Sequence, residues 1–203
     1  MLSQNTDIML LLLFLWMFYF GLHSLLADHG IKTRILSHYP QLASFYRFFY
    51  TLFAGGSILP LFWYQCYVLN TGYMWQLEGL SKGVCIGLAI IGGLIMAYSI
   101  WQYSLSEFIG IDQLSGKTKN DMPTLITTGL SGIVRHPLYL GMLLLATSLV
   151  FLFPNSPNWI FLFVLIAYLL IGIPLEEKKL IRIFGEKYIT YKQRVKTLIP
   201  FIW

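Results

Sequence analysis

Charged residues are scarce in this chain of 203 residues, of which only 11% are Asp, Glu, Lys or Arg. A soluble globular domain carries about a quarter charged residues, so this chain has too few to cover a surface that faces water. Disordered, collagen-like and coiled-coil proteins are excluded as well, because 57% of the residues are hydrophobic and no matching repeat is present. The composition therefore indicates a single domain that lies in a lipid bilayer.

Cysteines and known catalytic motifs are also scarce. Cys66 and Cys85 each lie in an apolar run, so they form neither a disulfide framework nor a metal-ligand spacing. The sequence has no phosphate-binding loop, no zinc-protease motif and no glycine-rich dinucleotide motif. The net charge of +5 is not gathered into a basic stripe with interleaved aromatic residues. We therefore expect no metal and no nucleic-acid partner.

Long uncharged runs predict the membrane spans, each of which needs roughly 20 mostly apolar residues. The runs lie at about residues 8–27, 48–69, 83–103, 137–153 and 159–175. The last two come from one uncharged stretch that is interrupted by Pro154-Asn155-Ser156-Pro157-Asn158, which predicts a tight helical hairpin. The first run lacks the basic start of a signal peptide, so we expect it to remain as an anchor.

The basic residues predict the topology. Five spans place thirteen of the fourteen Lys and Arg residues on one side of the membrane and only Lys82 on the other. The N-terminus is then outside and the C-terminus cytoplasmic, as expected for a bacterial inner membrane protein. Segment 104–136 becomes a cytoplasmic loop, and the apolar spacing within the cytoplasmic tail 176–203 predicts an amphipathic helix. The predicted fold is an all-α integral membrane protein with five transmembrane helices, forming one membrane domain over residues 1–203.

The hairpin brings two polar segments to the same membrane depth. Arg135-His136-Pro137 opens the fourth span and Glu176-Glu177 follows the fifth, each about twenty residues from Ser156. Pro137 suits the first turn of a helix, whose free N–H groups beside Arg135 can bind a carboxylate, while the Glu pair can take a cation or a proton. The two segments form either a reaction centre or an ion pair that only fixes the hairpin. His23 near the end of the first span either faces this site or pairs with a neighbouring side chain.

Three motifs follow one another in the second half of the chain. They are Arg135-His-Pro-x-Tyr-x-Gly141, then Glu176-Glu177, then Phe184-Gly-x-x-Tyr-x-x-Tyr191. In this order they resemble the isoprenylcysteine carboxyl methyltransferase family and its membrane relatives, over roughly residues 105–203. One departure is Lys196, which stands where the relatives usually have Pro.

The resemblance implies a site for S-adenosylmethionine at the cytoplasmic interface, outside any Rossmann fold. It implies that Arg135 and one Glu of the pair, for which we take Glu177, are catalytic. The residues implied to hold the cofactor are His136, Pro137, Tyr139, Leu140, Glu176, Phe184 and Tyr188. The tail 176–203 would complete this site. A thiol acceptor also needs a base, for which a Glu at the lipid edge could serve.

The first half of the chain resembles a particular branch of these relatives. Leu22-His-Ser-Leu-Leu-Ala27 and Tyr46-Arg-Phe-Phe-Tyr50 are similar to the methanethiol S-methyltransferase and NnrU-like branch. The resemblance implies an S-adenosylmethionine-dependent membrane methyltransferase that acts on a thiol or another small lipophilic nucleophile reaching it from the bilayer. Two alternatives stay open: a protein-S-isoprenylcysteine carboxyl O-methyltransferase, and a non-catalytic NnrU-like membrane protein.

Overall fold

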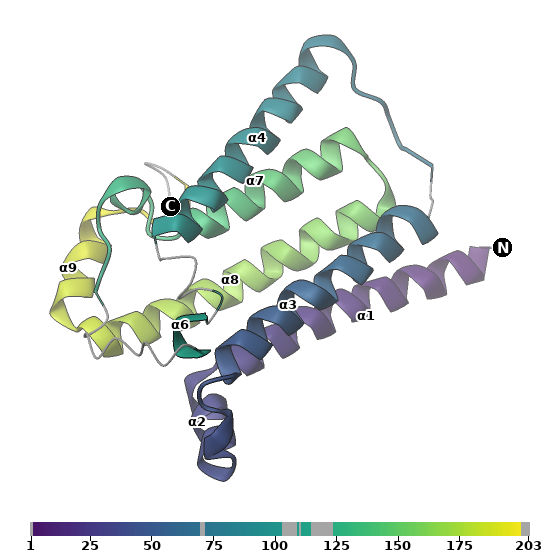
Figure 1. Ribbon diagram of the computed structural model, residues 1–203. Coiled ribbons are helices and arrows are strands. Elements are labelled where there is room, and N and C mark those ends of the chain that lie inside the picture. The colour runs from purple at the N-terminus through teal and green to yellow at the C-terminus, as the bar shows by residue number, and fades with distance from the viewer. Residues whose placement is uncertain (1, 70–71, 103–108, 110, 115–123, 200–203) are drawn as a thin grey trace. The chain divides into compact units, whose positions relative to one another are not determined.

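The computed structural model describes residues 2–69, 72–102, 109, 111–114 and 124–199 (Figure 1). These residues form helices joined by turns and loops, and no β-strand occurs among them. The all-α prediction is therefore confirmed for the described part of the chain. The contacts divide the chain into two compact units. Unit 1 comprises Met1–Gly72, Tyr103–Asn120 and Asn155–Val164, and unit 2 comprises Tyr73–Gln102, Asp121–Pro154 and Leu165–Trp203.

The apolar helices make this a membrane protein. Three helices in the described residues are long and apolar enough to cross a bilayer: Thr6–Ala27 within α1 (Leu2–Ala27), α4 (Gly79–Gln102) and α8 (Ser156–Phe184). Helix α7 (Pro137–Leu152) is apolar and shorter. Large apolar side chains are exposed along these helices, and a soluble protein rarely exposes apolar surface on this scale. Lipid is the solvent that suits such an exterior.

The remaining helices follow the predicted segments closely. Helix α3 (Tyr46–Trp63) continues into the π-helical turn η2 (Tyr64–Val68), which together match the run 48–69. The short elements are α2 (His29–His38), η1 (Pro40–Leu42), α6 (Ile111–Leu114), η3 (Gly129–Gly132) and α9 (Glu186–Arg194). Much of the predicted loop 104–136 lies outside the described residues.

The predicted hairpin is formed by α7 and α8, which run antiparallel in Figure 1. Helix α7 ends at Leu152 and α8 begins at Ser156, so the connection is very short. The carboxamide oxygen of Asn155 accepts a hydrogen bond from the Asn158 N–H at 2.9 Å, which satisfies one of the free donors at the start of α8. Pro157 also lies in this first turn, where the missing N–H of proline costs no helical hydrogen bond.

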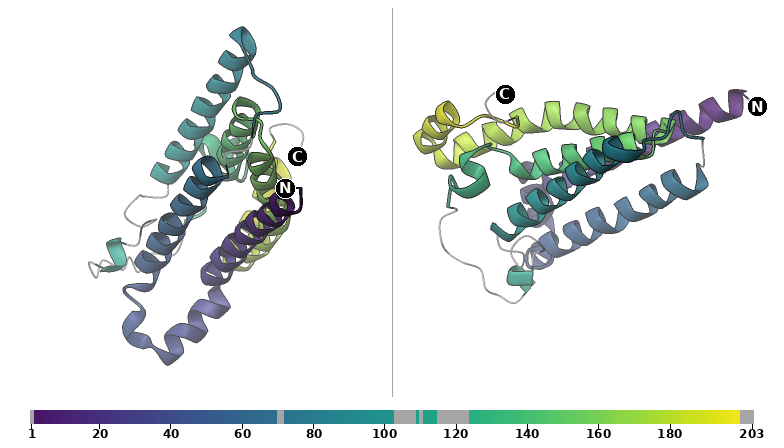
Figure 2. Two further views of the ribbon diagram at one scale, coloured as in Figure 1. Left: turned by 90° about the vertical axis from the view of Figure 1, so that its right-hand side faces the viewer. Right: turned by 90° about the horizontal axis from the view of Figure 1, so that it is seen from above.

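The end of α8 differs from the prediction. The sequence predicts a span that ends at residue 175 and a separate amphipathic helix over 176–196, but α8 continues without a break to Phe184. Hydropathy changes at Leu175, yet α8 does not end there, although Pro174 lies inside it. The helix ends where Gly185 adopts a φ of +57°, a conformation that glycine reaches easily. Helix α9 then turns away from the end of α8 (Figure 2).

In unit 2, α4 packs closely against α7 through two glycines. A Cβ atom added at Gly141 would lie 2.7 Å from the carbonyl oxygen of Gly92 and 2.6 Å from Cγ of Met96. A Cβ atom added at Gly92 would in turn lie 2.9 Å from the carbonyl oxygen of Gly141. Small residues that let helix backbones approach are the usual basis of helix association in membranes. This contact fixes the start of α7, where the polar residues lie.

Gly141→Ala is expected to destabilise the protein by about 1–3 kcal/mol, because the added methyl group overpacks the α4–α7 contact. The measurement is the unfolding midpoint of the purified protein in detergent. Gly93→Ala is the matched control, since a Cβ atom at Gly93, which follows Gly92 in α4, meets nothing within 4 Å. Equal stability of the two variants would contradict the close contact.

In unit 1, a chain of buried hydrogen bonds joins α1, η2 and the start of α8. The indole N–H of Trp16 donates to Oε1 of Gln65 at 2.8 Å, and Nε2 of Gln65 donates to Oδ1 of Asn158 at 2.7 Å. The rings of Phe62 and Phe161 pack on the Trp16 ring, with centroids 5.1 and 4.6 Å away. In a lipid solvent such a fully bonded polar chain selects one arrangement of helices.

Candidate functional site

In unit 2, the segment Arg135-His136 lies next to Glu176-Glu177, as the predicted hairpin requires. Nε of Arg135 donates to Oε1 of Glu177 at 2.7 Å, and Nη2 of Arg135 lies 2.5 Å from the same oxygen. Nε2 of His136 lies 3.5 Å from Oε1 of Glu177, and Nδ1 of His136 lies 3.6 Å from Oε2 of Glu176. We call Arg135, His136, Glu176 and Glu177 the ionic cluster. Its formation confirms the predicted convergence.

Local helix geometry decides which residue points inward. His136 precedes Pro137, the first residue of α7, so the polar segment lies at the start of that helix. Because α8 continues past Leu175, the two Glu residues are consecutive helical residues and point about 100° apart. Glu177 is therefore buried, whereas the Glu176 side chain is 40% exposed.

The end of the described chain, residues 192–199, is bound to the start of α7, and we call it the C-terminal segment. The Arg135 N–H donates to the Lys196 carbonyl at 2.8 Å, and the His136 N–H donates to the Thr197 carbonyl at 3.1 Å. Nη1 of Arg135 donates to the carbonyls of Lys192 and Val195, and Nη2 donates to Oγ1 of Thr197 at 2.8 Å. The guanidinium group thus uses its donors on Glu177 and on this segment. Its contacts are those of a residue that holds the C-terminal segment in place.

Lys192 completes the charge balance of the cluster. Its Nζ lies 2.5 Å from Oε2 of Glu177, while Arg135 contacts Oε1 of the same carboxylate. A carboxylate between two cations is stabilised as the anion and is a weak base. Glu177 is therefore poorly suited to the role of base that a thiol acceptor requires.

Sequence reasoning did not single out Lys192 and Thr197. Lys192 follows Tyr188 by four residues in α9, so both lie on one face of that helix. That spacing is the only signal that could have assigned Lys192 to the site. Thr197 reaches Arg135 from an irregular segment, and no periodicity predicts that contact.

Two tyrosines of α9 pack beside the cluster. The Tyr191 hydroxyl donates to the Ser131 carbonyl at 2.6 Å, which ties α9 to the loop before α7. Tyr188 is only 1% exposed, and its ring centroid lies 5.7 Å from that of Tyr191. Burial raises the pKa of Tyr188, and the nearby Glu177 carboxylate raises it further. The phenol consequently stays protonated and remains a hydrogen-bond donor.

Three buried polar atoms of the site have no hydrogen-bond partner among the described residues. They are the Tyr188 hydroxyl, Nε2 of His136 and Oε2 of Glu176. Burial lowers the pKa of His136 against the opposing effect of Glu176 and Glu177, so the ring is neutral at pH 7. Buried polar atoms that stay unpaired cost free energy, and each needs an explanation. Nε2 of His136 and Oε2 of Glu176 keep the longer contacts of the cluster, at 3.5 and 3.6 Å, so the Tyr188 hydroxyl is the atom of the three that a ligand would have to satisfy.

The other residues expected to hold a cofactor lie on the same elements. The Tyr139 ring stacks on the His136 ring, with centroids 5.5 Å apart and an angle of 11° between the planes. The Leu140 N–H donates to the His136 carbonyl at 3.1 Å, which is a helical hydrogen bond of the first turn of α7. Phe184 is half-buried at the last position of α8. The structure thus pairs Tyr139 directly with the ionic cluster.

His23, by contrast, has a partner in unit 1. The Tyr50 hydroxyl lies 3.0 Å from Nε2 of His23, and their ring centroids are 5.3 Å apart. This contact favours the second of the two interpretations of His23, a helix-end histidine that pairs with a neighbouring side chain.

Fold and site together define a class: a helical membrane protein with a buried, charge-balanced cluster where a helical hairpin meets the C-terminal segment. The chain belongs to the phospholipid methyltransferase family, whose profile matches residues 83–187. The matched region contains most of α4, all of α7 and all four residues of the ionic cluster. No solved structure matches the chain.

The curated relatives include two methyltransferases from Bradyrhizobium diazoefficiens. Methanethiol S-methyltransferase 1 is 33% identical over 186 residues, which cover 88% of this chain and 62% of the relative. Methanethiol S-methyltransferase 2 is 31% identical over 183 residues, covering 88% of this chain and 68% of the relative. Protein-S-isoprenylcysteine O-methyltransferase of Saccharomyces cerevisiae is 43% identical over 89 residues, covering 42% and 37%. The chain spans about three fifths of the length of several methanethiol S-methyltransferases that it matches.

Proposed function

We propose that the protein is an S-adenosylmethionine-dependent methyltransferase that methylates a thiol or another small lipophilic nucleophile. The observation that carries the proposal is the buried Tyr188 hydroxyl, which has no hydrogen-bond partner among the described residues and lies beside a charge-balanced cluster. The similarity to methanethiol S-methyltransferases extends over most of the chain and favours a small thiol as acceptor.

The residues present fit S-adenosylmethionine. Glu176 offers a carboxylate oxygen to its ammonium group, and the Tyr188 hydroxyl, which has no hydrogen-bond partner among the described residues, offers a donor to its carboxylate. The N-terminus of α7 adds the positive end of a helix dipole, which favours the same carboxylate. When bound, the donor supplies an electrophilic methyl group on a sulfonium cation, which an in-line nucleophile can accept.

We assign different roles to the two residues for which the resemblance implies catalysis. Glu177 supplies a fixed negative charge next to a cationic methyl donor, which the two cations around it hold in one position. Arg135 contacts Glu177 and the C-terminal segment, so we infer that it is a positioning residue. Glu176 and the neutral His136 are the groups of the cluster that can accept the proton of a thiol.

We also propose the five-span topology, with the N-terminus outside and the C-terminal segment in the cytoplasm of a bacterium. Helices α1, α4 and α8 would supply three spans, α3 together with η2 a fourth, and α7 the fifth. The distribution of Lys and Arg along the sequence supports this orientation. The ionic cluster then lies at the cytoplasmic end of its helices.

The test of the proposed function is methyl transfer from labelled S-adenosylmethionine by the purified protein. We expect a short alkanethiol to be methylated with a kcat/KM at least about tenfold above that of a farnesylcysteine carboxylate, because an acceptor pocket discriminates by the groups it buries. Transfer to the farnesylcysteine carboxylate alone would favour the isoprenylcysteine alternative. Transfer to neither acceptor by a folded protein would favour the non-catalytic alternative.

A further inference from the structure

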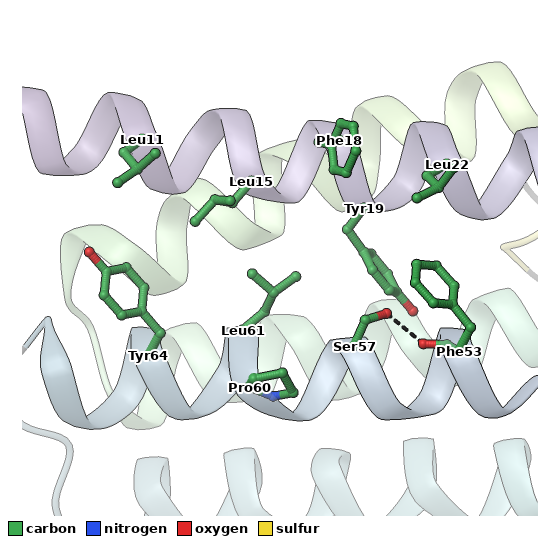
Figure 3. Close-up of a pocket in the computed structure, with 10 residues that line it drawn as sticks. All are labelled: Leu11, Leu15, Phe18, Tyr19, Leu22, Phe53, Ser57, Pro60, Leu61 and Tyr64. Atoms are coloured by element: carbon green, nitrogen blue, oxygen red, sulfur yellow. Dashed lines mark hydrogen bonds between the residues drawn. The ribbon is translucent and has the colours of Figure 1, made fainter.

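An apolar groove runs between α1 and α3 in unit 1 (Figure 3). It encloses about 480 Å³, which lies within the roughly 300–1,000 Å³ typical of sites for small molecules. Leu11, Leu15 and Leu22 of α1 face Phe53 and Leu61 of α3 across it. Neither the site in unit 2 nor the proposed methyl transfer uses this groove.

Helix α1 carries two adjacent apolar stripes with different surroundings. Leu12, Trp16 and Phe20 form one stripe, and it is buried in the core of unit 1. The neighbouring stripe contains Leu11 and Leu15 and faces the groove. Leu11 is 48% exposed, so this second stripe remains accessible to an apolar molecule from the bilayer.

The groove walls present hydrocarbon. Two of the polar side chains that line it use their hydroxyls on backbone carbonyls: Tyr19 donates to Ala54 at 3.2 Å, and Ser57 donates to Phe53 at 2.6 Å. Figure 3 shows the Ser57 hydroxyl turned along its own helix, toward the Phe53 carbonyl. A hydrocarbon chain would lose no hydrogen bond on entering such a groove, and each buried methylene adds favourable free energy.

Basic residues of the sequence lie beyond one end of the groove. The groove ends at Leu22 and Phe53, near the end of α1 and the start of α3. Tyr46, the first residue of α3, donates its hydroxyl to the Leu26 carbonyl at 2.8 Å, and Nζ of Lys32 in α2 lies 5.9 Å from the centre of its ring. These contacts hold α2 at that end of the helix pair. Between residues 28 and 47 the chain has Lys32, Arg34 and Arg47 against the single acid Asp28.

We propose that this groove binds one acyl chain of an anionic phospholipid, with the lipid phosphate beside Lys32 and Arg34. An apolar groove that opens to the bilayer and has basic residues beyond one end suits an amphiphile with a negatively charged head group. Clusters of Lys and Arg next to a membrane helix attract anionic lipid head groups. A free phosphate ion would leave the groove unfilled, and a zwitterionic lipid would bring a second cation next to the Lys and Arg side chains.

The test uses the full chain, delipidated in detergent and titrated with phosphatidylglycerol or phosphatidylcholine of the same acyl chains. Bound lipid is counted by native mass spectrometry. We expect saturable binding of one phosphatidylglycerol molecule, which Lys32→Gln with Arg34→Gln weakens and Lys82→Gln leaves unchanged. Leu15→Trp fills the groove, and exclusion of as few as two methylenes weakens binding about tenfold. Leu10→Trp is its matched control, because Leu10 is 58% exposed on the same helix.

Three results would overturn the proposal. Equal binding of phosphatidylcholine would show that the basic residues do not select the lipid. Equal binding by Leu15→Trp and Leu10→Trp would place the acyl chain elsewhere. Displacement of phosphatidylglycerol by a farnesylated cysteine in an equimolar competition would assign the groove to a methyl acceptor. Methyl transfer by the unit 2 site is measured separately, so failure of this proposal leaves the proposed function intact.

Discussion

Arg135→Ala is expected to release the C-terminal segment and to abolish methyl transfer. The substitution removes the hydrogen bonds to the carbonyls of Lys192 and Val195 and to the Thr197 hydroxyl. It also removes one of the two cations that hold the buried Glu177, and breaking a buried ion pair in this way costs about 3–5 kcal/mol. The expected readouts are a lower unfolding midpoint in detergent and faster tryptic cleavage after Arg194 and Lys196.

Two further variants separate positioning from general destabilisation. Arg182→Ala removes an exposed arginine near the end of α8, and we expect it to behave as the wild type. Arg135→Lys keeps the charge but cannot make the forked contacts, so we expect it to recover part of the stability and to raise KM for the methyl donor more than it lowers kcat. An Arg135→Ala variant that keeps the wild-type midpoint, cleavage pattern and activity would refute this role.

Glu177→Gln is expected to lower kcat/KM for methyl transfer by at least about 100-fold, because it removes a preorganised charge from the reaction site. The substitution keeps the shape of the side chain but leaves Arg135 and Lys192 facing each other without the anion between them. It also removes a negative charge that favours binding of the sulfonium cation over binding of the neutral thioether product, so part of the loss is expected in KM. The measurement is methyl transfer from labelled S-adenosylmethionine, with Glu186→Gln on the exposed surface of α9 as control.

A double variant shows whether the loss comes from charge imbalance alone. Glu177→Gln combined with Lys192→Met restores the net charge of the cluster, so we expect most of the lost stability to return. Methyl transfer should stay low, because the negative charge at this position is still missing. Recovery of activity in the double variant would reduce Glu177 to a structural ion-pair partner.

The convergence of the ionic cluster could be predicted because it depends on counting residues. The Pro154–Asn158 breaker divides one long apolar stretch, and equal distances along antiparallel helices bring Arg135 and His136 level with the Glu pair. The contacts of the C-terminal segment could not be predicted in this way. They run through backbone groups of Lys196 and Thr197, and backbone hydrogen bonds of an irregular segment leave no pattern in the sequence.

The boundary between α8 and the tail was misplaced for a related reason. The change from apolar to charged residues after Leu175 marks the edge of the lipid, and that edge does not require the helix to end. The Trp16–Gln65–Asn158 chain was also missed. Gln65 is a lone polar residue in an apolar run, and Asn158 lies in a segment whose residues predict a turn. Only the three-dimensional packing shows that these side chains complete one another.

We propose that the polar groups of the ionic cluster and Tyr188 bind the methyl donor. Calorimetric titration of the folded, detergent-purified protein with S-adenosylhomocysteine measures this binding. We predict saturable binding of one molecule per chain, weakened about tenfold in Tyr188→Phe, which lacks the unpartnered hydroxyl. Absence of saturable binding by wild-type protein with a cooperative unfolding transition would contradict the claim, and the non-catalytic interpretation would then take its place.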